Sequence, residues 1–313
     1  MTRQLHAAVA LAAGLLLTTC GLTCFGFAKG SADAPPVETV ATMPEGEALE
    51  ALTEVPNGTI YFTVAGWNVD QTVWKLPQGG QAGKFVDLPA HPLGLISTKD
   101  GFMLTAVTRR PGGANAPVSG YGGQVLVLNK SGAVIKTIHA DPQSFPNGIT
   151  QARKEYLVAD SFGGTIWRVN LTKRNLEPWL RDDLLAPTPG RQGANGLKAN
   201  GDWVYVSNTS RGAVYRIQID AKGRPVGKLA LYAPVPAPDD FGVVNGGTIY
   251  IPSNGDMLKI SPQGEVTTFL EGSGSSSAAM VSRDQRWLYW VTRGTAPGGV
   301  RLVPKMYRVR IQP

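Results

Sequence analysis

Short hydrophobic segments, separated by turns rich in glycine, proline and asparagine, run along most of the chain. Segments of this length, with β-branched and aromatic residues inside them, predict strands rather than helices. One series recurs at intervals of about 45 residues, a spacing typical of a repeat architecture. Its members are TIYFTVA (59–65), FMLTAV (102–107), EYLVAD (155–160), WVYVSN (203–208), TIYIPS (248–253) and WLYWVT (287–292).

A second series follows the first, and most of its members place an aromatic or aliphatic pair beside a basic residue. These segments are TVWKL (72–76), QVLVL (124–128), TIWRV (165–169), AVYRI (213–217), DMLKI (256–260) and MYRVRI (306–311). The two series together predict an all-β chain folded as a six-bladed β-propeller, because radial stacking would bury both faces of each small sheet. The segment VETVATMP (37–44) is predicted to supply the outermost strand of the last blade and to close the ring.

The composition agrees with a folded chain that turns often. Of the 313 residues, 42% are hydrophobic and 17% are charged, and there are 38 glycines and 23 prolines. This balance excludes a disordered chain and is typical of an all-β protein.

The N-terminal residues 1–28 are predicted to be a secretory signal peptide. Arg3 supplies the positive charge, residues 7–17 form a short apolar run, and the small residues Gly26 and Ala28 precede a possible cleavage site. The apolar run is too short to span a bilayer, so no membrane span is expected in the mature chain. Residues 29–313 are then a single propeller domain with a secreted or periplasmic destination.

Charge and cysteine content narrow the possible functions. Cys20 and Cys24 both lie in the predicted signal peptide, where lipid attachment is the less favoured alternative. The mature chain then has no thiol for disulfides or metal binding. The net charge of +7 falls to +6 when Arg3 is removed, and the scattered basic residues favour a solvated surface over nucleic-acid binding.

Two Asn-Gly pairs, Asn195-Gly196 and Asn200-Gly201, are too close together for both to be hairpin turns. Asn200-Gly201 falls between a first and a second strand, and so do the pairs at 57–58, 100–101 and 245–246. These pairs predict hairpins. Asn195-Gly196 instead begins a first strand, at a phase shared by one position in each blade. That series is Glu50, Leu93, Asn147, Asn195, Asp239 and Ala278.

First strands line the central channel of a propeller, so these six positions are predicted to form a ring at one mouth. Two carboxylates and two amides in this ring predict a site for a hard divalent cation such as Ca²⁺, Mg²⁺ or Mn²⁺. Ordered water or exposed strand ends could satisfy the same polar groups. His91 and His139 are expected in loops outside the ring, which argues against a zinc-type site.

The motifs at these positions resemble those of the SMP-30/gluconolactonase/LRE family of six-bladed propellers. LEAL at Glu50 is similar to that family's E-G-P motif, PNGI at Asn147 and ANGL at Asn195 to its N-G motifs, and PDDF at Asp239 to its P-D-G-M motif. The resemblance implies a hydrolase of lactones or related esters. It also implies that Glu50, Asn195 and Asp239 bind the ion, that Asn147 contacts the substrate, and that Asp239 is the catalytic base.

The chain departs from the family pattern at several positions. Ala51 follows Glu50 where the family has glycine, and Asp240 replaces the glycine after Asp239, which leaves open which aspartate faces the channel. Arg109, with Arg110 beside it, is the candidate substrate-binding arginine. These differences resemble a divergent secreted branch of the family.

Two other functions compete with a hydrolase. A non-catalytic, NHL-like propeller would bind a protein or glycan through the long loops at 109–123 and 184–195, which are equally well explained as ordinary connections. A strictosidine-synthase-like enzyme is less favoured, because it needs a channel glutamate. After Glu50, the candidates Glu155 and Glu271 fall on a second strand and in a turn.

Overall fold

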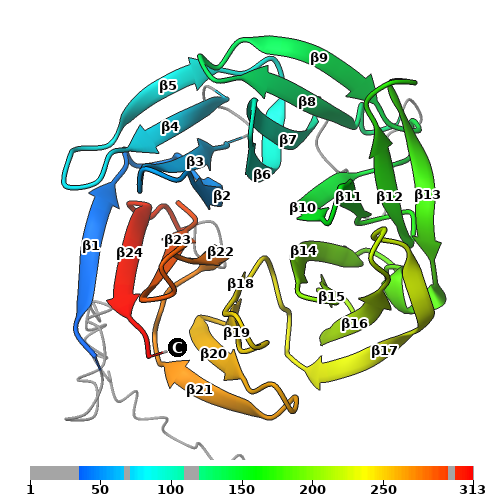
Figure 1. Ribbon diagram of the computed structural model, residues 1–313. Helices are drawn as coiled ribbons and strands as arrows, with labels where there is room; N and C mark the ends of the chain where they lie inside the picture. The colour runs from blue at the N-terminus through cyan, green and yellow to red at the C-terminus, as the bar shows by residue number, and fades with distance from the viewer. Residues whose placement is uncertain (1–34, 67–70, 109–119, 295–299, 313) are drawn as a thin grey trace, which may run out of the picture.

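The computed structural model describes residues 35–66, 71–108, 120–294 and 300–312. They form six four-stranded sheets arranged around a central axis (Figure 1). Every strand pair in these sheets is antiparallel, and the six sheets are here called blades 1 to 6 in chain order. The predicted all-β, six-bladed propeller is confirmed. Within the part of the chain described, no helix is long and apolar enough to traverse a bilayer.

Each blade runs from an inner strand at the channel to an outer strand at the rim. Blade 1 contains β2 (Leu49–Glu54), β3 (Ile60–Val64), β4 (Thr72–Leu76) and β5 (Gly83–Asp87). Blade 2 contains β6 (His91–Thr98), β7 (Gly101–Val107), β8 (Gln124–Asn129) and β9 (Val134–His139). Blade 3 contains β10 (Pro146–Ala152), β11 (Glu155–Asp160), β12 (Thr165–Asn170) and β13 (Asn175–Arg181).

The remaining blades follow the same order. Blade 4 contains β14 (Ala194–Asn200), β15 (Trp203–Asn208), β16 (Ala213–Ile219) and β17 (Pro225–Pro234). Blade 5 contains β18 (Gly242–Val243), β19 (Ile249–Ser253), β20 (Asp256–Ile260) and β21 (Val266–Leu270). Blade 6 contains β22 (Ser276–Val281), β23 (Trp287–Thr292) and β24 (Lys305–Arg310), and a short 3₁₀ helix, η1 (Asp183–Leu185), lies between blades 3 and 4.

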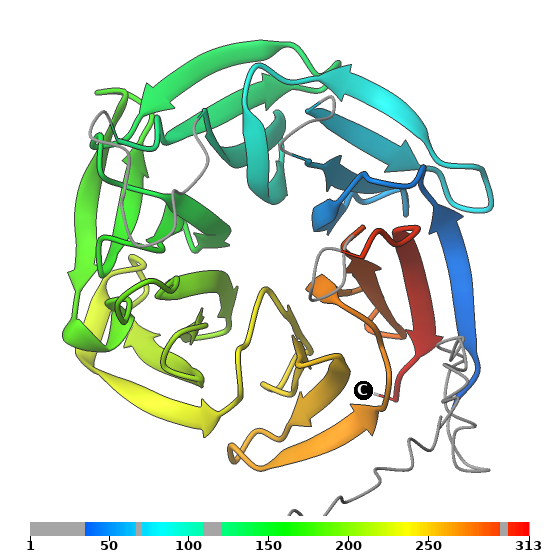
Figure 2. The ribbon, with the colours of Figure 1, turned by 180° about the vertical axis from the view of Figure 1, so that it is seen from behind.

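The ring is closed by a strand from the opposite end of the chain. β1 (Val37–Thr42) pairs with β24 as the outermost strand of blade 6, with Val37 opposite Val309 and Thr42 opposite Lys305. Figures 1 and 2 both show this strand lying along the C-terminal strand. The predicted closure by residues 37–44 is therefore confirmed. It joins blade 6 to the N-terminal segment, so opening the ring would require breaking a full strand pairing.

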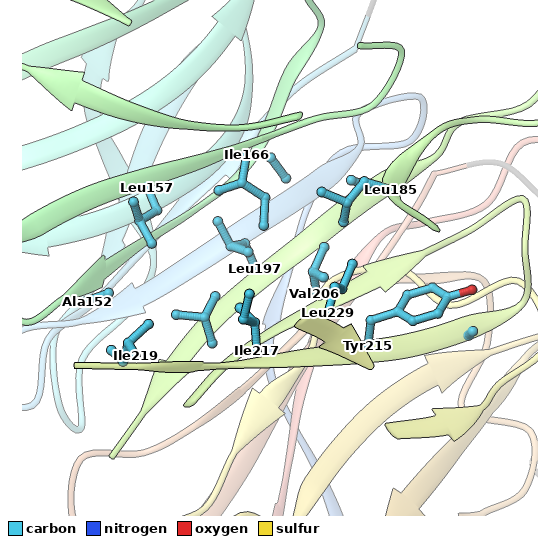
Figure 3. Packing of buried hydrophobic residues seen from close by; sticks show 14 residues of the cluster. Ala152, Leu157, Ile166, Leu185, Leu197, Val206, Tyr215, Ile217, Ile219 and Leu229 are labelled. Carbon is cyan, nitrogen blue, oxygen red and sulfur yellow. The ribbon is translucent and has the colours of Figure 1, made fainter. Parts of the chain in front are cut away.

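Hydrophobic layers between neighbouring blades hold the ring together. Six clusters of buried side chains each draw on two adjacent blades. In the layer between blades 3 and 4, Leu157 and Ile166 of blade 3 lie beside Leu197 and Ile217 of blade 4 (Figure 3). Removal of this aliphatic surface from water is the main stabilising contribution to such a stack.

Two histidines lie in strands rather than in the predicted loops. His91 is the first residue of β6 and pairs with Val107, while His139 ends β9 opposite Gln124. The inner strand of blade 2 begins earlier than expected, because its pairing with β7 continues past an irregularity in the register. The imidazole of His91 is consequently buried within the sheet.

Candidate functional site

The inner strands of four blades each begin with a β-bulge. The register skips between Leu49 and Leu52, Pro92 and Leu95, Pro146 and Ile149, and Ala194 and Leu197. In each case two residues of the inner strand face one residue of the second strand. A bulge re-aims side chains at the end of a sheet, and the residues in these bulges are Glu50-Ala51, Leu93-Gly94, Asn147-Gly148 and Asn195-Gly196.

The glycines of the two bulged Asn-Gly pairs are needed for close packing between blades. Gly201, in the hairpin, has a φ of +59°, whereas Gly148 and Gly196 do not take a left-handed φ. A Cβ atom on Gly196 would lie 2.7 Å from Asp240 Cα, and one on Gly148 would overlap the carbonyl oxygen of Asn195. Glycine therefore lets the next blade approach the ring.

Hydroxyl groups on the second strands fix the ring residues of the next blade. Ser207 Oγ accepts a hydrogen bond from Gly196 N at 2.8 Å and donates one to Asp239 O at 2.9 Å. In blade 2, Thr105 Oγ1 accepts from Gly94 N at 2.7 Å and donates to the carbonyl of Asn147. Each hydroxyl thus joins the bulge of its own blade to the ring residue of the following blade.

Blades 5 and 6 build the ring differently. Asp239 precedes β18, and the neighbouring Asp240 exchanges backbone hydrogen bonds of 3.2 Å with Ser277 and Ala279 of blade 6. The register of β22 skips only one residue, Ser277. The ring position in blade 6 is therefore Ser277 and not Ala278 as predicted, because this bulge is one residue shorter than the others.

Three of the predicted site residues meet at one mouth of the channel. The guanidinium of Arg293 forms an ion pair with Asp239, and its Nε lies 3.9 Å from Glu50 Oε2. The Asn195 side chain also acts on the Asp239 carboxylate, whose pKa it lowers. Side chains from blades 1, 4, 5 and 6, distant in sequence, thus share one small site.

Burial sets the protonation behaviour of the two carboxylates. Burial raises the pKa of Glu50 to about 7; the positive charge of Arg293 opposes the change, and the negative charges of Asp239 and Asp240 add to it. Burial also raises the pKa of Asp239, again against the effect of Arg293. In turn, the negative charge of Asp239 raises the pKa of Arg293. The single guanidinium does not fully offset the cost of burying two carboxylates.

The two consecutive aspartates have different partners. Asp239 contacts Arg293 and Asn195, whereas Asp240 forms an ion pair with Lys198 of β14, with Oδ2 2.6 Å from Nζ. Asp240 is thus paired one to one with a lysine of the neighbouring blade. The carboxylate that meets Glu50 through Arg293 is that of Asp239.

Asn147 lies at the ring position of blade 3, next to blade 4, and its Nδ2 donates to Ser161 Oγ at 3.1 Å. Asn195 donates in the same way to Thr209 Oγ1 at 3.0 Å. The structure places Asn147 in the ring but records no contact between it and the Glu50–Asp239 pair. The candidate substrate-binding Arg109 lies outside the described residues, as does Arg110.

Arg293 was not anticipated from the sequence. It is the residue directly after the second strand of blade 6, and the equivalent residues of blades 1 to 5 are Ala65, Thr108, Ser161, Thr209 and Asn254. Among these six positions Arg293 alone carries a charge. Aligning the residues after the second strands, and not only the starts of the inner strands, would have identified it.

The connection between blades 3 and 4 is tightly held. Asn208 Nδ2 donates to the carbonyls of Leu184 and Ala186, at 2.9 and 3.2 Å, and Thr188 N donates to Ser210 Oγ at 3.0 Å. This part of the 184–195 loop is an ordered connection. The other loop proposed to present a partner surface, residues 109–123, lies mostly outside the described residues.

A separate cavity of about 720 Å³ opens over blade 3, lined among others by Asp160, Trp167 and Arg181. It includes none of the ring residues. The buried Asp160 accepts hydrogen bonds there from Phe145 N and Trp167 Nε1, at 2.9 and 3.0 Å, so its role is structural. Among the described residues, no group of three or more His, Cys, Asp and Glu side chains is placed to hold a metal ion.

Comparison with known proteins identifies solved structures that have the same fold. No family model and no curated protein sequence matches the chain. Solved structures do match it. A gluconolactonase from Xanthomonas campestris has a TM-score of 0.64 at 15% identity, over 87% of this chain and 89% of that one. The chain shares the fold of these proteins.

Two further structures widen the range of functions on this fold. Regucalcin from Agrobacterium tumefaciens, described as a calcium-binding protein, has a TM-score of 0.60 at 14% identity, over 87% of this chain and 94% of that one. Virginiamycin B lyase from Staphylococcus aureus has a TM-score of 0.59 at 12% identity, over 88% and 99%. At such low identity the likeness establishes the architecture, and function must be argued from the site.

Proposed function

We propose that this protein hydrolyses a small-molecule lactone or related ester at the mouth of its channel. The observation that supports this most is the meeting of the Glu50 and Asp239 carboxylates, from blades 1 and 5, on one guanidinium. Convergent, partly buried polar groups in a channel mouth are the usual mark of a small-molecule site. The gluconolactonase among the similar structures favours a lactone as the substrate class, and regucalcin, described as a calcium-binding protein, favours a divalent ion.

A divalent cation fits the side chains present. The donors are oxygens of two carboxylates and one amide, which are ligands that Ca²⁺, Mg²⁺ and Mn²⁺ accept. A cationic group, Arg293, already stands against both carboxylates. When both are ionised, the two carboxylates carry a charge of −2, which one guanidinium offsets only in part and a divalent ion would balance. Glu50, Asn195 and Asp239 would hold the ion, which supplies Lewis acidity toward a carbonyl oxygen.

Asp239 is the proposed catalytic base. Its carboxylate takes a proton from the attacking water as the new carbon–oxygen bond forms, and returns it to the alkoxide released when the ring C–O bond breaks. Burial makes Asp239 more basic than an exposed aspartate. The carbonyl of Asp239 is held by Ser207 and its side chain by Arg293, so the carboxylate is oriented before substrate binds.

Asn147 and Arg109 are proposed to contact the substrate. Asn147 is fixed from two sides, by Thr105 at its carbonyl and by Ser161 at its side-chain amide. The remaining side-chain oxygen can accept a hydrogen bond from a substrate hydroxyl. We also propose that residues 1–28 are a signal peptide that directs the protein out of the cytoplasm. N-terminal sequencing of the protein from the periplasm or medium would test this.

Hydrolysis of a panel of sugar and aliphatic lactones, followed in a pH-stat, tests the proposed activity. Asp239→Asn is expected to lower the rate by at least about 100-fold, the usual contribution of a positioned general base. Chelation should abolish the activity and Mn²⁺ or Ca²⁺ should restore it. Asp240→Asn is the matched control, since it removes a neighbouring carboxylate paired with Lys198, and should retain most activity. Activity that survives both chelation and Asp239→Asn would contradict the proposal.

A further inference from the structure

Arg293 lies next to Glu50 and Asp239, the two charged side chains proposed to bind the cation. Its guanidinium contacts Asp239 and reaches within 3.9 Å of Glu50, so one positive charge serves two carboxylates. Asp240, the next residue along the chain, has Lys198 as its own partner. The two groups therefore differ in charge balance: the Lys198–Asp240 pair is neutral, whereas the Arg293 group carries a net negative charge when both of its carboxylates are ionised.

The backbone of Arg293 is fixed while its side chain remains partly open to solvent. Arg293 N donates to Ser275 O at 2.7 Å, and the carbonyl of Gly294 accepts from Leu302 N at 2.7 Å. A Cβ on Gly294 would collide with the carbonyl of Glu47, so this stretch is packed closely against blade 1. Yet the Arg293 side chain is 40% exposed, against 19% for Glu50 and 11% for Asp239. The arginine side chain is thus more exposed than either of the carboxylates that it contacts.

We propose that Arg293 is a built-in counter-cation that competes with a divalent ion for the Glu50–Asp239 pair. Without the ion, the guanidinium neutralises part of the buried negative charge. When the ion binds, the side chain swings toward solvent about its fixed backbone. A like charge beside the ion opposes its binding, so Arg293 lowers the affinity of the site. This inference rests on the proposed function, because it takes Glu50 and Asp239 as the ion's ligands.

Calorimetric titration of the chelator-treated full-length protein with Mn²⁺ tests the competition. Arg293→Gln is expected to lower the Kd for Mn²⁺ at least tenfold, since it removes the competing charge and leaves a shorter, neutral polar side chain. Arg293→Lys should stay closer to the wild type. Lys198→Gln is the matched control: it removes a positive charge from the adjacent pair, and is expected to change the Kd less than threefold.

A second measurement follows the side chain itself. Phenylglyoxal modification of Arg293, read by mass spectrometry of the peptide that contains it, should become faster when Mn²⁺ is present. Unchanged modification, an unchanged Kd in Arg293→Gln, or equal tightening in Lys198→Gln would each overturn the counter-cation role. If Glu50→Gln abolishes Mn²⁺ binding in that case, the metal site stands and only the role of Arg293 fails. Absence of Mn²⁺ binding in the wild type and in Arg293→Gln would overturn both.

Discussion

The two ends of β14 carry the same dipeptide under different physical constraints. At the channel mouth, Asn195-Gly196 occupies a bulge, and blade 5 leaves no room for a Cβ on the glycine. At the other end, Asn200-Gly201 makes a hairpin in which Gly201 has a φ of +59° and open space around it. One glycine is required by its neighbours and the other by its backbone conformation. The difference shows that the structural role of an Asn-Gly pair can be predicted only when its position within the repeat is known.

The largest effect on this comparison is expected from adding one methyl group at each end. Gly196→Ala should destabilise the protein by about 3 kcal/mol, because the new Cβ would press on the backbone of Asp240 and Asp239. Gly201→Ala should cost only about 1 kcal/mol, the penalty for a left-handed φ in open space. Urea unfolding of both variants measures the difference. Equal losses would show that blade contact does not set the need for Gly196.

His91, which begins the inner strand of blade 2, is expected to make the stability of the protein depend on pH. Burial lowers the pKa of His91 to about 4. In the unfolded chain the imidazole binds a proton at about pH 6.5, whereas in the folded protein it binds one only near pH 4. The free energy of unfolding therefore decreases as the pH falls from about 6.5 toward 4. The loss reaches about 3 kcal/mol at its limit.

Unfolding measured across this pH range in the wild type and in His91→Gln checks the prediction. The variant lacks the titrating imidazole, so the difference between the two stabilities should shrink or reverse at acid pH. Parallel pH profiles for the two proteins would show that His91 does not carry this dependence.

A smaller effect is expected at the hydroxyl that connects the mouth end of β14 to blade 5. Ser207→Ala leaves the buried Gly196 amide and Asp239 carbonyl without this partner, at a cost of about 2 kcal/mol. The proposed activity should fall as well, since Asp239 loses one of its supports. Ser207→Thr keeps the hydroxyl, as Thr105 does in blade 2, and is the control. A Thr variant as impaired as the Ala variant would exclude the hydrogen bonds as the cause.

Much of the fold follows from the repeat in the sequence. The predicted segments 155–160, 203–208 and 287–292 coincide with β11, β15 and β23, because second strands are buried on both faces and so have a strong hydrophobic pattern. Outer strands such as β13 have mixed burial and a weak pattern. They were not located individually, although the strand that closes the ring was.

The site was harder to anticipate than the strands. The phase of the inner strands placed Glu50, Asn195 and Asp239 at one mouth, because the bulges recur at the same point of blades 1 to 4 and Asp239 lies just before the inner strand of blade 5. Arg293 comes from the end of a second strand, so that phase could not include it. The ring position of blade 6 was predicted at Ala278 but lies at Ser277, because the sequence does not reveal the length of a bulge. The partners of a charged residue depend on how far its side chain extends toward the neighbouring blades. The spacing of residues along the sequence does not give this information.

Anomalous diffraction from crystals soaked in Mn²⁺ tests the central claim most directly. The account predicts a single strong peak bounded by the side chains of Glu50, Asn195 and Asp239, with the Arg293 guanidinium displaced from Asp239. A peak elsewhere in the molecule, or no peak at this mouth with Arg293 still on both carboxylates, would contradict it.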